Sequence, residues 1–525
     1  MQEQEYRFGA NIIENLTTGM YQDSKVIYRE YIQNACDQID KAIEEGILQQ
    51  NEGQIEIWFD QNNRTVTIRD NATGITAADF QRVLGNIADS DKDFSKDKGF
   101  RGIGRLCGLA YCRELIFESK AKGENIISKV ICNAQKMRNL ITEHHKGKKH
   151  EAGFVLKQIF HFETEQTDNN NDHYFTVELK GINDENNDLL DKIAIKNYLS
   201  FVAPVPYQNT FRFRTNIKKY AQEKNYNIDE YNIKLDGEQI FKNYTDKIKD
   251  NKGECTDEIF DIEFYDVKDE NGNLLAWMWL GLSKFDKVLP KKTNPMRSFR
   301  LRKGNIQIGN EDVLQKLFNE ERGQNYFVGE VFAVSTDLIP NSQRDYFNET
   351  PTRRNFEDSL QNFFSKDLYK IYYDGSKINS SVKKITDYEK DKTEYNKKEK
   401  TGIFINEEQK KNEYEKLKDK RLKAENAQNE IKKINEKAKE NGGVYGQIIE
   451  QVINKVVKEE NCLKPAPLPI QRPIQKRRTD ELGKFNSKER KIIERVFEII
   501  HLEMDTETAD KLIDKITKGL KKGLR

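Results

Sequence analysis

The chain has 525 residues, with 88 Lys and Arg against 87 Asp and Glu and 36% hydrophobic residues. No apolar run approaches the ~18–20 residues that a membrane helix needs, the first residues lack a secretory signal pattern, and the six cysteines and six histidines show no metal-ligand spacing. We therefore expect a cytoplasmic protein of three or four modules, with reduced cysteines and no membrane contact.

The N-terminal elements predict a mixed α/β domain. Apolar residues at helical spacing predict a long helix from Ser24 to Ile43, with Ser24 as its cap. Alternation at period two predicts several short strands around a second helix. The expected strands are Gln54–Phe59, Thr65–Arg69, Leu115–Glu118 and Ile126–Ile131, and the expected second helix is Ala77–Leu84.

Beyond residue 375 the sequence changes character. Residues 1–375 carry 51 basic and 60 acidic side chains, a net of −9, whereas residues 376–525 carry 37 and 27, a net of +10. A basic tail therefore follows an acidic body, and we expect the two parts to have different roles. The expected tail elements are a solvated helix or coiled-coil arm at Gln409–Lys439, an amphipathic helix at Val444–Lys458, and a helical pair at Ser487–Leu502 and Thr506–Leu520 with Asp505 as a cap.

Three polar side chains interrupt the apolar side of the first long helix. Offsets of four and seven residues place Glu30, Asn34 and Asp37 on one stripe. A carboxylate there can activate a water molecule, and an amide oxygen suits Mg²⁺, which takes oxygen ligands. For this segment alone, an ordinary solvated helix face is the alternative interpretation.

Two further segments follow along the chain. Asp70 ends a strand and precedes Ala72 and Gly74, small residues that let the backbone approach a flat ligand while the carboxylate accepts a hydrogen bond. Residues 99–104 have GxxGxG spacing, which permits positive φ and turns backbone amides toward phosphate oxygens. This is not a dinucleotide-binding fingerprint, because no βαβ unit with an acidic residue ~20 positions further on surrounds it. By itself, the segment that begins at Asp70 is also compatible with a simple Asp-Asn turn.

The order and spacing of these three segments resemble the N, G1 and G2 boxes of the GHKL ATPase superfamily, most closely those of the heat-shock-90 (HtpG-like) chaperones. The resemblance covers about residues 10–135. It implies a Bergerat-type two-layer α/β sandwich that binds ATP and Mg²⁺. The expected division is an ATP-binding domain at 1–145, an α/β transducer or middle domain at 146–375, a charged helical or coiled-coil arm at 376–460, a Pro-rich linker at 461–485 and a C-terminal helical pair at 486–525.

The resemblance also implies a role for each matching residue. Glu30 would be the general base, Asn34 would coordinate Mg²⁺, and Asp37 would support the site through Mg²⁺-bound water or the nucleotide. The residues expected to contact the nucleotide are Asp70 with Gly74 at the adenine, the amides of Gly102, Ile103 and Gly104 at the phosphates, and Ser119, through water, at the adenine. Ala72 stands where the family usually has a glycine, and we expect its methyl group to tighten the adenine pocket or shift affinity without removing a catalytic atom.

A second region supports this resemblance. Residues 329–345 resemble the middle-domain loop of heat-shock-90 chaperones, in which an arginine reaches the γ-phosphate. Arg344 fits that role, because a guanidinium can stabilise charge that develops on the phosphate. Arg300, Arg302 and Lys303 are weaker candidates for phosphate or partner contacts, with solvated strand-edge charges as the alternative.

The resemblance implies a slow Mg²⁺-dependent ATP hydrolase that works as an ATP-gated dimeric clamp, chaperone-like on protein clients. A lid at Asp89–Gly104 would close over ATP, and the apolar helices at Val444–Lys458 or Ser487–Leu520 would hold the homodimer. Two alternatives stay open. One is a nucleic-acid-associated clamp of the microrchidia type, as in anti-phage defence, which the basic residues Lys476–Arg478 and Lys521–Arg525 would favour. The other is a non-hydrolysing nucleotide-sensing adaptor, which would not need Glu30.

Overall fold

The computed structural model describes residues 8–17, 19, 23–87, 104–401, 404, 407–460, 465–470, 482 and 485–522. The chain divides into two compact units, Met1–Ser283 with Val288–Lys366 and Lys284–Lys287 with Asp367–Arg525, and each is presented by itself. Several expected features lie outside the described residues. These are Gly102 and Ile103, the lid except for Gly104, the basic cluster Lys476–Arg478 and the last three residues of the chain.

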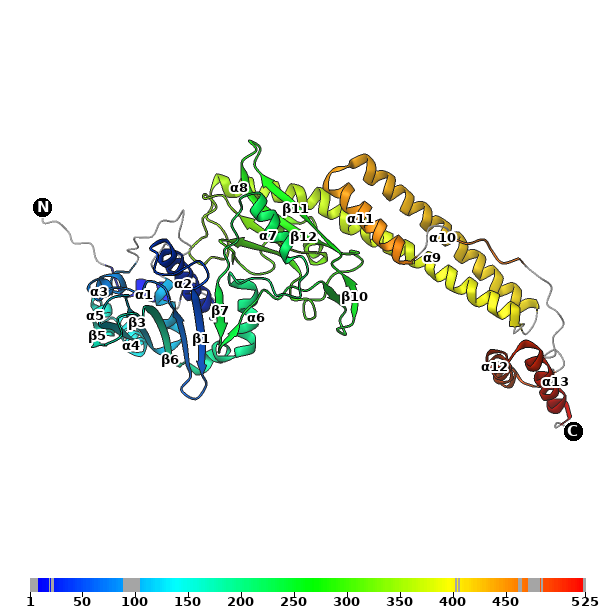
Figure 1. Cartoon of the computed structure of the whole chain (residues 1–525), viewed down its shortest axis with the longest axis horizontal. Helices are drawn as coiled ribbons and strands as arrows, with labels where there is room; N and C mark the ends of the chain where they lie inside the picture. Colours follow the sequence, from blue (N-terminus) through cyan, green and yellow to red (C-terminus); the bar gives the residue numbers. More distant parts are fainter. Residues whose placement is uncertain are drawn as a thin grey trace. The chain divides into compact units, whose positions relative to one another are not determined.

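An eight-stranded sheet organises the N-terminal part of the first unit (Figure 1). Its strand order is β5-β4-β3-β6-β2-β1-β7-β8, and all neighbours are antiparallel except β1 and β7. The strands are β1 (Gln54–Asp60), β2 (Thr65–Asp70), β3 (Cys112–Lys120), β4 (Ile126–Asn133), β5 (Phe160–Gln166), β6 (Tyr174–Ile182), β7 (Asn232–Leu235) and β8 (Glu238–Gln239).

Alternating side chains give this sheet one apolar face. Ile55 and Ile57 on β1, and Val66 and Ile68 on β2, enter the same buried core because every second residue of a strand points to the same side. The helices that contribute to this core are α1 (Asn11–Thr17), α2 (Val26–Glu44), α3 (Ala77–Gly85), α4 (Ala134–His145), α5 (Ala152–Ile159) and α6 (Lys192–Val202). The expected two-layer α/β sandwich is therefore confirmed.

Strands from well beyond residue 145 complete this sheet. β6 pairs with β3 on one side and with β2 on the other, so the sheet is not continuous without it. The parallel strand β7 and its neighbour β8 extend the other edge as far as Gln239. The sheet thus uses more of the chain than the first expected segment. Because these strands are distant in sequence, no local sequence pattern predicts where the domain that contains this sheet ends.

The start of α2 differs from the expectation. The residue before the helix is Lys25, which makes no side-chain capping bond, and the hydroxyl of Ser24 donates to the carboxylate of Asp188. The prediction that Ser24 caps the helix is therefore wrong. A serine hydroxyl near a helix start competes between the helix amides and any nearby acceptor, and here the tertiary contact prevails.

A second sheet forms the rest of the first unit. Its five strands are ordered β11-β12-β15-β13-β14, and the apolar strand β12, which carries Trp277 and Trp279, lies between β11 and β15. The strands and helices of this part are β9 (Lys247–Lys249), β10 (Cys255–Glu258), β11 (Asp261–Lys268), β12 (Leu274–Leu282), β13 (Ser298–Lys303), β14 (Ile306–Gln307), β15 (Val328–Ala333), α7 (Arg214–Glu223) and α8 (Pro351–Phe363). β9 and β10 form a separate two-stranded ribbon.

A buried group of charges lies within this second part. Glu330 on β15 is fully buried and forms ion pairs with Arg302 on β13 and with Lys242, whose ammonium nitrogen lies 3.1 Å from the carboxylate. Tyr244 and Trp279 also donate to the same carboxylate, at 3.1 and 3.2 Å. Because Arg302 is fully buried in this cluster, the expectation that it contacts phosphate or a partner is wrong.

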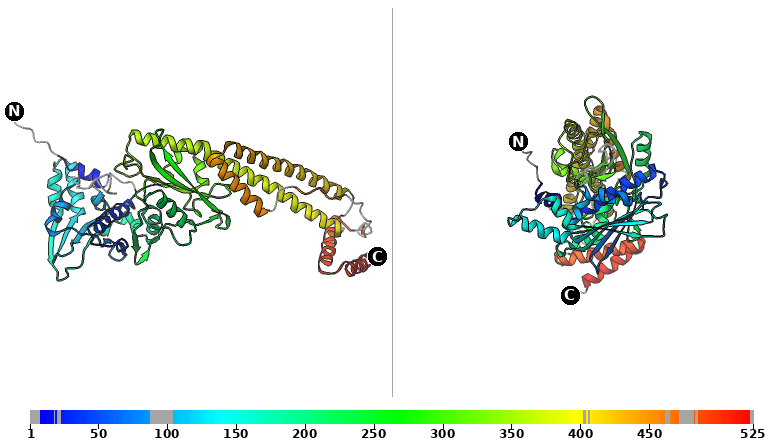
Figure 2. Two further views of the ribbon diagram at one scale, coloured as in Figure 1. Left: turned by 45° about the horizontal axis from the view of Figure 1, so that its top comes forward. Right: turned by 90° about the vertical axis from the view of Figure 1, so that its left-hand side faces the viewer.

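Three long helices form a bundle in the second unit, and Figures 1 and 2 show them side by side from several directions. They are α9 (Tyr369–Thr401), α10 (Glu407–Asn441) and α11 (Gly443–Glu460). The apolar face predicted for α11 is buried, so it is covered within this chain. Its buried residues include Ile448, Ile449, Val452 and Val456. The proline-rich residues 465–470 contact α9, since the hydroxyl of Tyr388 donates to the carbonyl of Ala466 at 2.7 Å.

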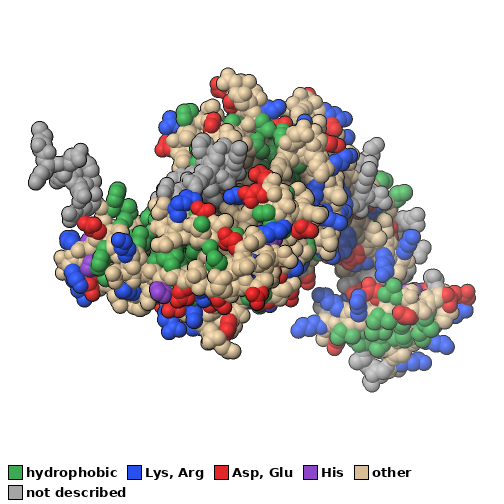
Figure 3. Space-filling model, turned by 60° about the vertical axis from the view of Figure 1, so that its left-hand side comes forward, with side chains coloured by type: hydrophobic (Ala, Val, Ile, Leu, Met, Phe, Trp, Pro, Cys, Tyr) green, Lys and Arg blue, Asp and Glu red, His purple; other side chains and the backbone are tan. Residues whose placement is uncertain are grey.

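A helical hairpin, α12 (Ser487–Glu503) and α13 (Thr506–Lys522), matches the expected C-terminal pair. Asp505 accepts from the amide of Thr508 at 3.1 Å, which confirms its predicted capping role. Phe497 and Ile513 lie in the small core between the two helices. Hydrophobic side chains also gather on the outer surface of the hairpin (Figure 3). No helix in the described part of the chain is long and apolar enough to cross a membrane.

The buried charge cluster yields a test of stability. Burial alone would raise the pKa of Glu330. The neighbouring cations Arg302 and Lys242 outweigh burial and lower this pKa to about 2. We expect Glu330→Gln to destabilise the fold by about 3–5 kcal/mol, because it leaves two buried cations without a counter-charge. In the native protein, the contribution of Glu330 to the free energy of unfolding should be fully present above pH ~4.3. It should be lost as the pH falls toward about 2.

Chemical denaturation of both proteins at neutral and acidic pH measures this difference. Glu349→Gln is the matched control, because Glu349 forms an exposed pair with Arg354 and should contribute less than about 1 kcal/mol. Equal stabilities of the two variants would contradict the role assigned to the buried cluster.

Candidate functional site

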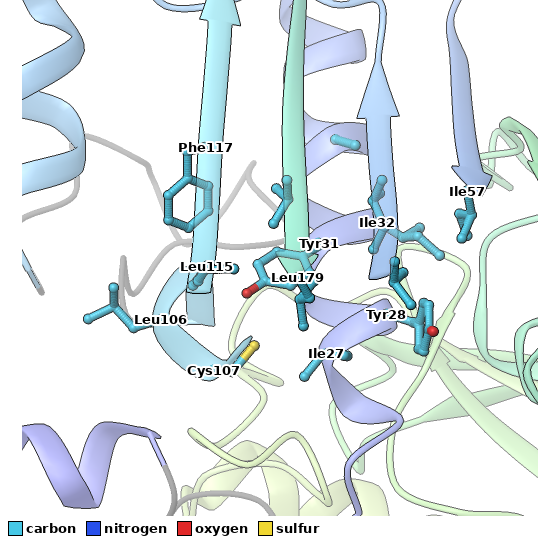
Figure 4. Packing of buried hydrophobic residues seen from close by; sticks show 14 of the residues in the cluster. Ile27, Tyr28, Tyr31, Ile32, Ile57, Leu106, Cys107, Leu115, Phe117 and Leu179 are labelled. Atoms are coloured by element: carbon cyan, nitrogen blue, oxygen red, sulfur yellow. The ribbon is translucent and has the colours of Figure 1, made fainter. Parts of the chain in front are cut away.

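Helix α2 positions the first group of candidate residues. Ile27, Tyr31 and Ile32 lie on its apolar side, beside Leu115 and Leu179 of the sheet (Figure 4). Packing of this side against the sheet leaves the adjoining stripe of Glu30, Asn34 and Asp37 at a cleft.

That cleft has a volume of about 1800 Å³ and lies in the first unit. Glu30, Asn34 and Asp37 all line it. Glu30 and Asp37 are buried, at 7% and 5% exposure, and Asn34 is half-buried. The three polar residues that share a stripe in the sequence therefore share one wall of a cleft. An ordinary solvated helix face would leave such carboxylates open to water.

Asp70 lies at the end of β2 in the same cleft. Its side chain is buried and accepts a hydrogen bond from the amide of Ala72 at 3.0 Å. Burial raises the pKa of Asp70 to about 7, against the lowering effect of that amide and of Arg69. A buried acceptor of this kind suits a ligand that offers a hydrogen-bond donor in a flat, apolar ring system.

Gly74 is required by the backbone of the loop after Asp70. Its φ is +65°, and a Cβ atom at this position would lie 2.1 Å from the carbonyl oxygen of Lys120. Ser119 holds the same loop, since its hydroxyl accepts from the amide of Ile75 at 2.7 Å and donates to the carbonyl of Tyr174 at 3.2 Å. Ser119 is fully buried, so in this structure its hydroxyl serves the loop that carries Gly74.

Ala72 occupies the position of the expected glycine without entering the cleft. It is fully buried, belongs to the apolar core under the sheet and does not line the cleft. His173 also contacts this loop, with its Nδ1 atom 2.6 Å from the carbonyl oxygen of Ala72. The additional methyl group is therefore accommodated by packing in the core.

Gly104 brings the chain directly over Glu30. It begins a short 3₁₀ helix that ends at Ala110. A Cβ atom on Gly104 would lie 2.5 Å from one carboxylate oxygen of Glu30, so a larger residue would displace that carboxylate. Gly104 thus lies beside Glu30 in the same cleft.

Arg344 reaches the same carboxylate from the loop after β15. Its Nε atom lies 3.6 Å from Oε1 of Glu30, and its side chain is 10% exposed. The backbone of Arg344 has a φ of +54°, an uncommon conformation for a residue with a side chain. The arginine that sequence resemblance selected, 314 residues after Glu30, is thus brought into contact with it.

Arg29 is a member of this site that sequence reasoning missed. Its guanidinium lies 3.4 Å from Oε1 of Glu30 and donates to the carbonyl of Gln343 at 3.0 Å. It therefore joins helix α2 to the loop that carries Arg344. Adjacent helix residues point about 100° apart, so the stripe through Glu30 does not include Arg29, and no local pattern marks it.

The donor set of the cleft fits Mg²⁺ bound together with phosphate. No group of three or more His, Cys, Asp or Glu suited to a metal occurs among the described residues. Asn34 supplies one amide oxygen, and the carboxylates of Glu30 and Asp37 lie on the same wall. Mg²⁺ commonly takes few protein ligands and completes its shell with water and phosphate oxygens. Asn34 is the residue that would hold it here.

Comparisons with known proteins find sequence similarity in the N-terminal region. Residues 24–159 match the family described as histidine kinase-, DNA gyrase B-, and HSP90-like ATPase. A chaperone protein HtpG of Coxiella burnetii (strain RSA 331 / Henzerling II) is 32% identical over 114 residues, which are 21% of this chain and 15% of that protein. HtpG of Helicobacter hepaticus is 29% identical over 131 residues, 22% of this chain and 21% of that protein.

HtpG of Verminephrobacter eiseniae is 32% identical over 132 residues, which are 22% of this chain and 20% of that protein. The matches therefore span about a fifth or less of the length of these relatives. The family match over residues 24–159 includes Glu30, Asn34, Asp37 and Asp70. The N-terminal region of this chain is a GHKL ATPase domain related to those of heat-shock-90-like proteins.

Proposed function

We propose that this chain is a Mg²⁺-dependent ATP hydrolase that works as an ATP-gated dimeric clamp on protein clients. The observation that carries the proposal is the meeting of Glu30, Asn34, Asp70 and Arg344 in one cleft of the first unit. These residues supply an adenine acceptor, a metal ligand, a base and a phosphate-end cation, which together make up an ATPase site.

The nucleotide would bind with its adenine at Asp70 and its phosphates near Gly104. The carboxylate of Asp70 accepts the exocyclic amino group, and the loop held by Gly74 and Ser119 keeps that carboxylate in place. Asn34 lines the same cleft and would hold Mg²⁺, which neutralises charge on the phosphates when it is bound.

Hydrolysis would proceed from the Glu30 end of the cleft. Glu30 accepts a proton from a water molecule as the water oxygen bonds to the γ-phosphorus, and the bond from that phosphorus to the bridging oxygen breaks to release ADP. Arg344 stabilises negative charge that develops on the phosphate. Arg29 supports both residues through its contacts with Glu30 and with the loop before Arg344.

The proposed homodimer and protein client do not follow from the residues of the cleft. The relatives carry the name chaperone, but the matches cover about a fifth or less of their length. A protein client is therefore proposed by relationship alone. A homodimer has separate support in the exposed apolar surface of the C-terminal hairpin, because exposed apolar patches mark interaction sites.

Replacement of the base tests the hydrolysis step. Glu30→Gln keeps the size of the side chain beneath Gly104 but cannot accept the proton, so kcat should fall on the order of 10²–10⁴-fold. ATP affinity should change little, as measured by calorimetry. Glu165→Gln, an exposed position on β5 that does not line the cleft, should leave both quantities unchanged. Wild-type turnover in Glu30→Gln would remove Glu30 from the mechanism.

The adenine end predicts a pH dependence of binding. With a pKa of about 7, Asp70 is ionised above neutral pH and accepts the amino group through a charge-assisted hydrogen bond. As the pH falls below about 7 the carboxylate becomes protonated, and ATP affinity should decrease. Asp70→Asn should bind ATP weakly at every pH. Equal affinities of the two proteins across pH 6–8, a range set about that pKa, would contradict this assignment.

The guanidinium of Arg344 should act on turnover more than on affinity. Arg344→Gln should lower kcat by on the order of 10³-fold, the range known for arginines that stabilise phosphoryl transfer. Arg354→Gln is the control, because Arg354 is 70% exposed and pairs with Glu349. If the two variants hydrolyse ATP at the same rate, Arg344 has no role in the reaction.

A further inference from the structure

His173 joins two segments of the first unit that meet at Asp70. It lies directly before β6, is half-buried, and its Nδ1 atom is 2.6 Å from the carbonyl oxygen of Ala72, in the loop after β2. A carbonyl oxygen only accepts hydrogen bonds, so we assign the ring proton to Nδ1, which donates. Ala72 is fully buried, and a buried carbonyl requires such a donor. The contact therefore fixes the loop after β2 to the start of β6.

Both segments act on the carboxylate of Asp70 through backbone amides. The amide of Ala72 donates to Oδ1 of Asp70 at 3.0 Å, and Phe175, two residues after His173, pairs with Asp70 in the sheet. Burial raises the pKa of Asp70, and the amides of Ala72 and Phe175 act in the opposite direction. If the loop moved away from β6, the hydrogen bond that Ala72 donates would weaken.

The preceding residue of the loop is attached to the other neighbour of β2. The side chain of Asn71 accepts from the amide of Gln54 at 2.7 Å and donates to the carbonyl of Glu52 at 2.9 Å, at the start of β1. His173 supplies the matching attachment of Ala72 to β6. Since His173 and Ala72 are 101 residues apart, no local sequence pattern predicts this contact.

We propose that His173 is a positioning residue for the adenine end of the cleft, holding Ala72 so that its amide keeps the carboxylate of Asp70 in place to accept the amino group of adenine. This inference rests on the proposed function, which places adenine at Asp70. The described residues that line the cleft of about 1800 Å³ include Asp70 but not His173. His173 therefore acts through Ala72 and not by contact with the nucleotide.

Charged groups from several elements surround Asp70. Arg69 precedes it on β2 and lowers its pKa, against the larger, raising effect of burial. Glu56 on β1 and Asp172 before β6 line a small pocket with Asp70, and Asp37 of α2 lines the cleft with it. Substitution of the histidine leaves all of these groups in the chain. A change in the titration of Asp70 would then come from the lost hydrogen bond or from the lost charge of the ring.

Three substitutions separate these two causes. His173→Phe keeps a planar ring without a donor, and His173→Gln moves the amide one carbon further from the backbone. His173→Asn places an amide nitrogen at the position of Nδ1, so it keeps a donor but carries no charge. In the nucleotide-free chain, the titration midpoint of Asp70 should rise from about 7 by about 0.5–1 pH unit in the first two variants, and by less than about 0.3 in His173→Asn.

NMR of isotope-labelled aspartate carboxyl groups follows this titration in the full-length chain, and Asp70→Asn identifies the signal. Circular dichroism checks that each variant is folded. His161→Phe is the matched control, because His161 is 73% exposed on β5 and pairs with Glu163, and it should leave the midpoint unchanged.

Nucleotide affinity gives a second readout, measured by calorimetry at pH 7. The dissociation constant of His173→Phe for ATP should be about three- to tenfold above the wild-type value, while kcat at saturating ATP should stay within about twofold. Purine riboside triphosphate lacks the amino group that Asp70 accepts, so wild type and His173→Phe should bind it equally, within about twofold. His173→Asn should bind ATP as the wild type does.

Three results would overturn the inference. These are an unchanged titration of Asp70 in both His173→Phe and His173→Gln, an equal loss of affinity for the two nucleotides, and a His173→Asn variant as impaired as His173→Phe. The proposed function fails separately. A chain in which the titration shifts as expected but which binds no ATP would refute the ATPase and leave the contact of His173 with the Asp70 loop intact. ATP binding that depends on Asp70 but not on His173 would refute only the inference.

Discussion

The packing of α2 against the eight-stranded sheet is the contact on which the candidate site depends. Its apolar side is buried under β1, β2, β3 and β6, which leaves only one direction for the stripe that carries Glu30, Asn34 and Asp37. The end of β2 then brings Asp70 to the same cleft. If the helix rotated about its axis on the sheet, these groups would separate. The packing of the core therefore also fixes the positions of the site residues.

The second sheet completes the site through the loop that follows β15. Glu330 on that strand pairs with Arg302 of the neighbouring strand and with Lys242, which follows the last strand of the first sheet. The backbone carbonyl of Phe201, at the end of α6, also accepts from Arg302 at 2.9 Å. This buried cluster therefore joins the two sheets of the first unit. It supports the position from which Arg344 reaches Glu30.

Local patterns predicted the elements that carry the site but not the contacts between them. The helix from residue 26 and the strand that ends at Asp70 follow from periodicity, and the C-terminal hairpin follows from periodicity and its capping residue Asp505. The central position of β6 and the contact of Arg29 with Gln343 connect segments far apart in sequence, and no local pattern encodes them. Arg344 became a candidate only through its resemblance to a known loop, since an arginine after a proline turn is otherwise unremarkable.

Binding and hydrolysis of ATP in the cleft of the first unit can be followed directly in one experiment. ATP labelled at the γ-phosphate is mixed with an excess of the full-length chain in the presence of Mg²⁺, and bound nucleotide and released phosphate are followed in the same sample. We predict that nucleotide binds and that labelled phosphate then appears slowly in a single turnover, with no release when Mg²⁺ is chelated. Stable binding without phosphate release would contradict hydrolysis in this cleft and favour a nucleotide sensor.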